Sequence, residues 1–140
     1  MKIKLDHVSV KFGDLYAVKD ISMTIDKGEY VTILGPSGCG KTTLIKIVSG
    51  ILRPTEGRVF VDGEDVTDVP IEDRDTGYVF QNIALFPHMT ISDNVGYGPR
   101  VRDLDSEAVT GTSRQYLELV NMLERAGMMP NEISGGEQQM

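Results

Sequence analysis

Gly35-Pro-Ser-Gly-Cys-Gly-Lys-Thr-Thr43 is the stretch of sequence that decides the fold. It lies between an apolar run typical of a β-strand, Tyr30–Leu34, and an apolar helical pattern, Leu44–Val48. The pattern G-x-x-x-x-G-K-[ST] is met in this strand–loop–helix setting at Gly35, Gly40, Lys41 and Thr42. The sequence therefore predicts a loop that binds phosphate groups.

Each residue type in this loop has a chemical reason. Glycines let the backbone curl so that successive N–H groups point at phosphate oxygens, and the following helix adds its positive N-terminal end. Lys41 can reach the β- and γ-phosphates of a nucleotide, and the Thr42 hydroxyl can ligate Mg²⁺. The alternative, a plain glycine-rich turn, explains neither the lysine nor the flanking patterns.

Composition narrows the class of protein. The chain has 140 residues, 40% apolar and 25% charged, which suits one globular domain. A net charge of −7 argues against general affinity for nucleic acid. No apolar run approaches the ~18 residues of a membrane span, and the start is not a secretory signal, so a cytoplasmic chain is expected. The single cysteine, Cys39, excludes an internal disulfide and favours a space-filling role over a redox role.

Alternation and turn residues predict the remaining elements. Two helices are expected, one from the phosphate loop to Gly50 and one from Ser113, as N-cap, to Gly127. Tyr30–Leu34 is nearly all apolar and is expected to be a buried parallel strand. Segment 91–98 has weak helical spacing, and Arg100–Thr112 shows no clear pattern. The other predicted strands are 2–10, 17–26, 58–61, 64–67 and 77–80.

Two further features accompany the phosphate loop. Gln81 ends a predicted strand 40 residues after Lys41, and Ser134-Gly-Gly-Glu-Gln138 forms a second glycine turn. Together the three motifs closely resemble those of ATP-binding-cassette (ABC) ATPases, and the resemblance covers Lys2 to Met140. The family's second motif is Leu-Ser-Gly-Gly-Gln, so Ile133 and Glu137 are departures from it.

The resemblance implies an ATP and Mg²⁺ site. Phe12 would stack on adenine, with Tyr16 as the rival and a turn-anchoring role as the alternative for Phe12. Gln81 would touch Mg²⁺ and the attacking water, so that Thr42 and Gln81 hold the metal and Lys41 and Gln81 act in catalysis. ATP would be held by Phe12 and by Gly35, Pro36, Ser37, Gly38, Cys39, Gly40, Lys41, Thr42 and Thr43.

The resemblance also implies partners. The signature loop would cap the γ-phosphate bound by a second subunit in a head-to-tail dimer, through Ser134, Gly135, Gly136, Glu137 and Gln138. Its alternative is a simple helix-start turn. Residues 82–98 would receive a membrane permease subunit in an apolar groove formed by Leu85, Phe86, Pro87, Met89 and Tyr97. Judged without the family resemblance, the same apolar residues are expected to be plain core. The chain would then be peripheral on the inner face of the cell membrane. His7 and His88 have no visible partners and are expected to be structural or surface residues.

The implied fold is α/β, that of a P-loop NTPase of the ABC type, with an N-terminal antiparallel β subdomain and a helical subdomain. Residues 1–81 would form the nucleotide-binding core, 82–133 the helical subdomain and 134–140 the signature motif. The family's later strands, with the Walker B aspartate, the catalytic glutamate and the γ-phosphate histidine, do not occur by Met140. The 140 residues alone are therefore expected to hydrolyse ATP negligibly and to be marginally stable.

The resulting hypothesis is the ATPase of an ABC importer. Its cargo would be an inorganic ion such as iron, sulfate, molybdate or tungstate, or a sugar or polyamine, and the chain itself does not encode the choice. The alternatives are a soluble ABC ATPase that acts on nucleic acid or ribosomes, which the acidic composition disfavours, and a non-catalytic ATP-binding fragment.

Overall fold

The computed structural model describes residues 1–82 and 84–140. The chain divides into two compact units, Met1–Tyr78 and Val79–Met140, each of which has its own core. Residue 83, which belongs to the predicted 82–98 groove, lies outside the described residues. The predicted division of the chain at 81/82 and 133/134 stays a prediction.

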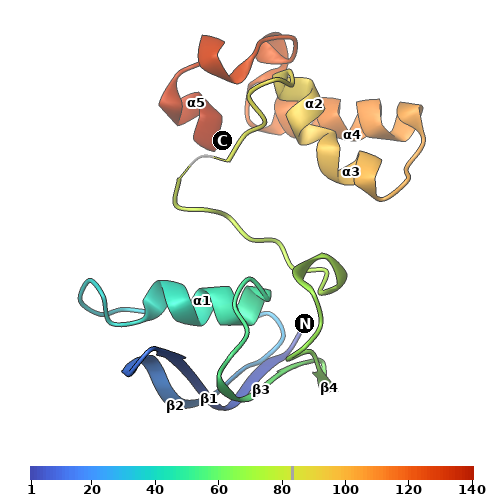
Figure 1. Cartoon of the computed structure of the whole chain (residues 1–140). Helices are drawn as coiled ribbons and strands as arrows, with labels where there is room; N and C mark the ends of the chain where they lie inside the picture. Colours follow the sequence, from blue (N-terminus) through green and yellow to red (C-terminus); the bar gives the residue numbers. More distant parts are fainter. Residues whose placement is uncertain (83) are drawn as a thin grey trace. The chain divides into compact units, whose positions relative to one another are not determined.

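Unit 1 is built on a four-stranded antiparallel sheet with the order β2-β1-β3-β4 (Figure 1). The strands are β1 (Ile3–Phe12), β2 (Leu15–Ile25), β3 (Glu56–Val61) and β4 (Glu64–Asp65). β1 pairs with β2 from Ile3↔Ile25 to Phe12↔Leu15, and with β3 through Leu5↔Val59. The expected hairpins and the N-terminal antiparallel subdomain are confirmed.

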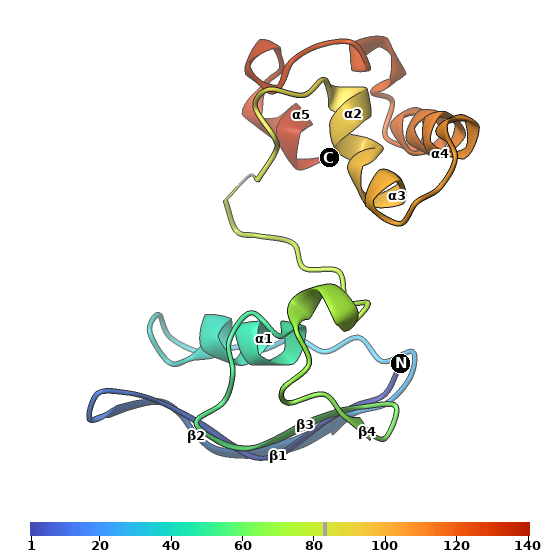
Figure 2. The ribbon, with the colours of Figure 1, turned by 45° about the vertical axis from the view of Figure 1, so that its right-hand side comes forward.

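One face of this sheet is covered by α1 (Lys41–Ser49), which lies across the strands in both views (Figures 1 and 2). The helix begins directly after the phosphate loop and ends at Gly50, whose N–H donates to the Ile47 carbonyl at 3.1 Å. Alternation along the strands and the helical period along α1 bring the same set of apolar side chains inward. The buried core consists of Leu5, Val8, Val10, Val18, Ile47 and Val59.

Gly40 is the point at which the phosphate loop comes into very close contact with β2. Its φ of 95° is in the left-handed region, and a Cβ at this position would collide with the Ala17 carbonyl oxygen. Gly38 has a similar φ of 81°, but a Cβ there would meet open space. Gly40 is therefore required both by its backbone conformation and by its contact, whereas Gly38 is required only by its conformation.

Arg74 is a buried residue that the sequence analysis did not single out. Its side chain is only 6% exposed and donates to four backbone carbonyls: those of Ile47, Val48, Thr67 and Val69, at 2.9–3.2 Å. Two of these carbonyls belong to the last turn of α1, where a cation is favoured by the helix dipole. Burial lowers the pKa of Arg74. This guanidinium ties the C-terminal end of α1 to the loop that follows β4.

Two predicted strands are absent. Tyr30–Leu34 and Gly77–Phe80 have no strand structure, and the side chains of Tyr30 and Val79 are 94% and 95% exposed. A strand that is apolar on both faces needs neighbouring strands and covering helices. The four described strands pair only with one another and supply no such neighbours. The apolar patterns are present, but the layer that would bury them is not among the described residues.

Unit 2 is helical. It contains α2 (Ile91–Val95), α3 (Tyr97–Val101), α4 (Ser106–Leu119) and α5 (Gly135–Gln139), with the 3₁₀ turns Leu123–Arg125 and Pro130–Glu132 between α4 and α5. Its buried core is formed by Ile91, Leu117, Met122 and Ile133. The predicted helical spacing in 91–98 is confirmed by α2 and α3, and α5 begins directly after Ser134.

The boundaries of α4 differ from the prediction. The helix starts at Ser106 because the Asp105 side chain accepts from Ala108 N at 2.8 Å, and it ends at Leu119 rather than at Gly127. Ser113 is not an N-cap but a buried mid-helix residue, whose hydroxyl donates to the Val109 carbonyl at 2.9 Å. Position 113 needs a small side chain because Gly96 packs closely against it. A Cβ at position 96 would lie 2.8 Å from the Ser113 Oγ.

His7 has a partner that its sequence context did not reveal. Its Nδ1 lies 2.7 Å from the Asp20 Oδ1, in an irregular stretch of the β1–β2 ladder where both residues have positive φ. The hydrogen bond with Asp20, and then the charge of Asp20, raise the pKa of His7 above its ordinary 6.5. The expectation that His7 has no partner was therefore wrong, although its surface location is confirmed.

Replacing Arg74 by methionine should lower the free energy of unfolding of unit 1 by about 2–3 kcal/mol, because buried carbonyl groups lose their donors. The matched control is Arg53→Met, which removes an exposed pair with Asp68 and should cost less than about 0.5 kcal/mol. Chemical denaturation followed by circular dichroism measures both. Equal effects of the two substitutions would contradict the anchoring role of Arg74.

Replacing Gly40 by alanine should destabilise unit 1 more than replacing Gly38 does. Gly38→Ala incurs only the left-handed strain, about 1–2 kcal/mol, whereas Gly40→Ala adds the collision with Ala17. Denaturation of the two variants side by side tests this, and a Gly40→Ala variant as stable as Gly38→Ala would refute the close contact.

The His7–Asp20 pair should be visible in a proton titration by NMR. The His7 midpoint should lie above 6.5 and fall toward that value in Asp20→Asn. Because the folded pKa is raised, the pair stabilises the fold fully below the unfolded pKa of ~6.5 and ceases to do so as the pH rises through the folded pKa. An unchanged His7 midpoint in Asp20→Asn would show that the pair does not form in solution.

Candidate functional site

The phosphate loop ends in a helix start that has free capacity for an anion. The first intrahelical bond of α1 runs from Leu44 N to the Gly40 carbonyl at 2.9 Å, so the N–H groups of the three residues before Leu44 have no acceptor within the helix. No acidic residue lies in the first turn, and no described side chain caps it. Backbone donors and the positive helix end therefore converge where the sequence predicts phosphate binding.

Lys41 is folded over its own loop. Its ammonium group donates to the Gly35 carbonyl at 2.8 Å and to the Pro36 carbonyl, and lies 3.5 Å from the Cys39 sulfur. The Cys39 thiol in turn packs on Gly35, where a Cβ would be 2.7 Å from the sulfur. Cys39 is nevertheless exposed, and its space-filling role stays a prediction. The lysine charge is thus held within the curl of the loop.

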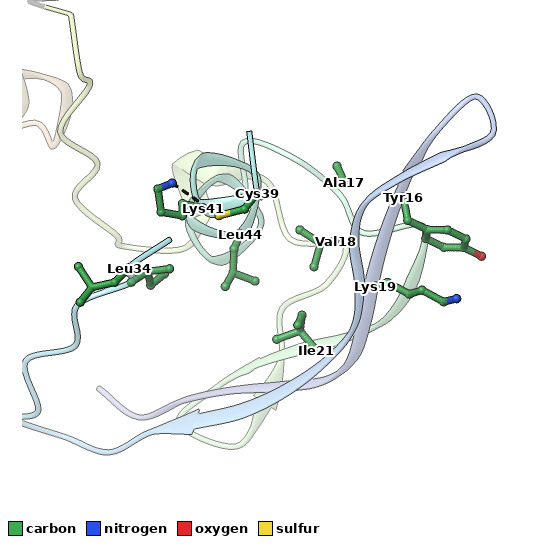
Figure 3. A pocket seen from close by; sticks show the side chains of 11 residues that line it. Tyr16, Ala17, Val18, Lys19, Ile21, Leu34, Cys39, Lys41 and Leu44 are labelled. Carbon is green, nitrogen blue, oxygen red and sulfur yellow. Dashed lines mark hydrogen bonds between the residues drawn. The ribbon is translucent and has the colours of Figure 1, made fainter. Parts of the chain in front are cut away.

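A cavity of about 410 Å³ adjoins the phosphate loop (Figure 3). Cys39, Lys41 and Leu44 lie at one end of it, and Tyr16 and Lys19 of β2 lie at the other. The Tyr16 ring has the ammonium groups of Lys11 and Lys19 at 5.4 and 5.2 Å from its centroid. Phe12 is not among the lining residues; it lies at the end of β1 with 57% of its surface exposed. Its adenine-stacking role stays a prediction.

The predicted metal ligands lie in different units. Thr42 is exposed on the first turn of α1 in unit 1, whereas Gln81 is an exposed residue of unit 2. Within residues 1–82 and 84–140, no cluster of three or more histidine, cysteine or acidic side chains could hold a metal. A hydroxyl next to bound phosphate is a fitting Mg²⁺ ligand, since Mg²⁺ is usually held by one or two protein oxygens, phosphate and water. The roles of Thr42 and Gln81 stay predictions.

The signature loop forms a complete capping box at the start of α5. The Ser134 hydroxyl accepts from Glu137 N at 3.3 Å, and the Glu137 carboxylate accepts from the Ser134 N–H and hydroxyl at 2.8 and 2.7 Å. These hydrogen bonds from Ser134, with Arg125 nearby, hold the pKa of Glu137 below its usual range. Gly135 and Gly136 are exposed, as is Ser134.

Gln138 has a structural task. Its side-chain amide donates to the Pro130 carbonyl at 2.7 Å and fastens the turn before α5 to the helix. The Gln138 side chain therefore faces residues of unit 2. Binding of a second subunit's nucleotide by Gln138, like that by the other signature residues, stays a prediction.

Asn94 organises the segment predicted to contact a permease. Its amide nitrogen donates to the Phe86, Met89 and Thr90 carbonyls at 2.9–3.2 Å, and its oxygen accepts from Phe86 N at 2.8 Å. The Phe86 and Tyr97 rings pack with centroids 4.5 Å apart, and His88 lies edge-on to Phe86. Thr90-Ile-Ser-Asp, a helix-start pattern, was the signal that could have drawn attention to this loop.

A second cavity, of about 260 Å³, lies within unit 2. It is lined by side chains of α2 and α4, by Val120 and Met122 just after α4, and by Glu137 and Met140 at the far end of the chain. Leu85, Phe86 and Met89, which were expected to line a groove, are not among its lining residues. In the described part of the chain, no helix is both long and apolar enough to span a bilayer.

Known proteins match this chain over most of its length. The family model for ABC transporters matches residues 18–140. The chain is 44% identical over 137 residues to the spermidine/putrescine import ATP-binding protein PotA of Protochlamydia amoebophila, covering 98% of this chain and 37% of that protein. It is 46% identical over 135 residues to the Fe(3+) ions import ATP-binding protein FbpC of Mannheimia succiniciproducens, covering 96% and 38%. The chain thus spans less than two fifths of the length of these relatives.

A solved structure supports the fold. The dimeric post-hydrolysis state of an ATP-binding cassette bound to ADP and Pi matches with a TM-score of 0.84 and 32% identity, over 97% of this chain and 65% of that one. The expected α/β fold class of the ABC type is confirmed. The family model covers the phosphate loop and the signature loop together. This chain therefore belongs to the ABC transporter family.

Proposed function

We propose that this chain binds ATP and Mg²⁺ as part of the ATPase of an ABC importer. The observation that carries the proposal is the first turn of α1, where Lys41 and backbone N–H groups without a capping side chain follow Gly40. A triphosphate would satisfy these donors. ATP would be held by the loop Gly35–Thr43, with the Thr42 hydroxyl on Mg²⁺.

Lys41 would exchange its partners when the nucleotide binds. Its ammonium group now donates to the Gly35 and Pro36 carbonyls, which are neutral acceptors. Phosphate oxygens are charged acceptors, so they would add an ion-pair attraction to the lysine ammonium that the neutral carbonyls lack. A short movement of the side chain would therefore gain energy while the loop keeps its backbone geometry.

Phe12 would supply the stacking surface for adenine. More than half of its surface is exposed at the end of β1. The rival, Tyr16, already has two lysine ammonium groups close to its ring. A free aromatic face gives affinity without strong selectivity among bases. The lysine ammonium groups beside the Tyr16 ring therefore favour Phe12 as the residue that stacks on adenine.

The signature loop would complete the site in a second copy of the chain. Ser134 and the two exposed glycines that follow it place small groups and backbone donors at a helix start, as the phosphate loop does. A head-to-tail dimer would bring Ser134, Gly135, Gly136, Glu137 and Gln138 to the γ-phosphate held by the first copy, and Gln81 would position the metal and the attacking water.

The relatives support a membrane partner and a range of cargo classes. PotA and FbpC are named as import ATP-binding proteins for polyamines and for Fe(3+). We infer a permease that docks on residues 82–98, where Asn94 holds the loop in place, and a location on the inner face of the membrane. The cargo would be a polyamine or an inorganic ion, with sugars as a further class.

Replacing Lys41 by alanine should weaken binding of Mg²⁺-ATP by about 10–100-fold, the equivalent of about 1.5–3 kcal/mol for a charged hydrogen-bond donor. The matched control is Lys46→Ala in the last turn of the same helix, which should bind as the wild type does. Isothermal titration measures both, and circular dichroism checks that each variant is folded. Unchanged affinity in Lys41→Ala would refute the site.

Purification from cells separates the proposal from its alternatives. Recovery with a membrane permease supports the importer, whereas recovery with ribosomes or nucleic acid would favour a soluble ABC ATPase. ATP binding without any turnover in the presence of the permease would favour a non-catalytic role.

A further inference from the structure

Arg125 forms an ion pair with Glu137 of the signature loop. The Arg125 Nε lies 3.5 Å from the Glu137 Oε1, and the two side chains are 47% and 27% exposed. The other carboxylate oxygen, Oε2, accepts both hydrogen bonds from Ser134. The two oxygens are thus divided between two neighbours, and the carboxylate is held on both sides.

Glu137 carries a negative charge in a loop that, under the proposed function, meets a phosphate. The Leu-Ser-Gly-Gly-Gln motif that this loop resembles has a neutral glutamine here. A carboxylate that approaches a phosphate is repelled by it, and the repulsion grows as water is excluded from between the two charges. The carboxylate therefore needs a compensating positive charge within the same unit if the loop is to approach an anion.

The turn that carries Arg125 is held firmly in place. Arg125 N donates to the Met122 carbonyl and Met128 N donates to the Arg125 carbonyl, both at 2.9 Å. The same turn accepts from the first residues of α2: Ile91 N donates to the Met128 carbonyl and Ser92 N to the Ala126 carbonyl. The backbone at Arg125 is thus fixed against the core of unit 2, and the Met128 sulfur lies 3.9 Å from its guanidinium.

We propose that Arg125 is a positioning residue of the nucleotide site, which neutralises Glu137 so that the Ser134–Gln138 loop can close on the γ-phosphate of a second copy. The inference rests on the proposed head-to-tail dimer. Arg125 does not touch the nucleotide; it acts through Glu137, so its importance depends on the charge at 137. A neutral residue at 137 makes Arg125 dispensable.

A double-mutant cycle tests this dependence. The intact protein is titrated with a non-hydrolysable ATP analogue and Mg²⁺, and dimer formation is followed by sedimentation. Arg125→Ala should raise the analogue concentration needed for half-maximal dimer formation about five-fold, whereas Arg125→Lys should stay near the wild type. In the Glu137→Gln background, Arg125→Ala should have no effect.

The control is Arg114→Ala, which breaks the exposed pair with Glu118 on α4 at 2.9 Å and should leave dimer formation unchanged. An equal effect of Arg125→Ala in both backgrounds, or a loss that follows only the melting temperature, would show a structural role and overturn the inference. If the wild-type protein binds the analogue with Lys41-dependent affinity and dimerises, and the Arg125→Ala variant dimerises equally well, the inference alone is overturned. A wild-type protein that stays monomeric would refute the proposed dimer, and the inference with it.

Discussion

The contact between Gly40 and the Ala17 carbonyl is the constraint on which the candidate site depends. It fixes the end of the phosphate loop against β2, and α1 starts from that point. The position of the helix start decides where the unpaired N–H groups aim, and Lys41 follows as the first residue of the helix. Any side chain at position 40 would separate loop from strand and move all of these donors together.

The other end of α1 is held by a different kind of interaction. Arg74 binds the carbonyls of the last turn, where the helix dipole is negative, and joins them to the loop that follows β4. The helix is therefore fixed by a steric contact at its N-terminal end and by a buried cation at its C-terminal end. This arrangement leaves the N-terminal end open for chemistry while the core of Val8, Ile47 and Val59 keeps the helix on the sheet.

In unit 2, the start of α5 is likewise held in place by specific contacts. Ser134 and Glu137 cap α5 reciprocally, Gln138 fastens it to the preceding turn, and Arg125 reaches the carboxylate from a turn that is hydrogen-bonded to α2. The segment proposed to meet a permease and the signature loop thus share one hydrogen-bonded framework around α2. In both units, the exposed candidate loop is defined by buried or backbone contacts behind it.

Sequence alone determined the features that depend on neighbouring residues: the phosphate loop, the end of α1 at Gly50 and the hairpins of the sheet. These follow from backbone conformation and local hydrogen bonds, which residue types encode directly. The tertiary structure decided the rest. Tyr30–Leu34 has the pattern of a buried strand but remains exposed, because a strand forms only against a partner. Arg74, Asn94 and Arg125 gain their roles from contacts that no spacing rule predicts.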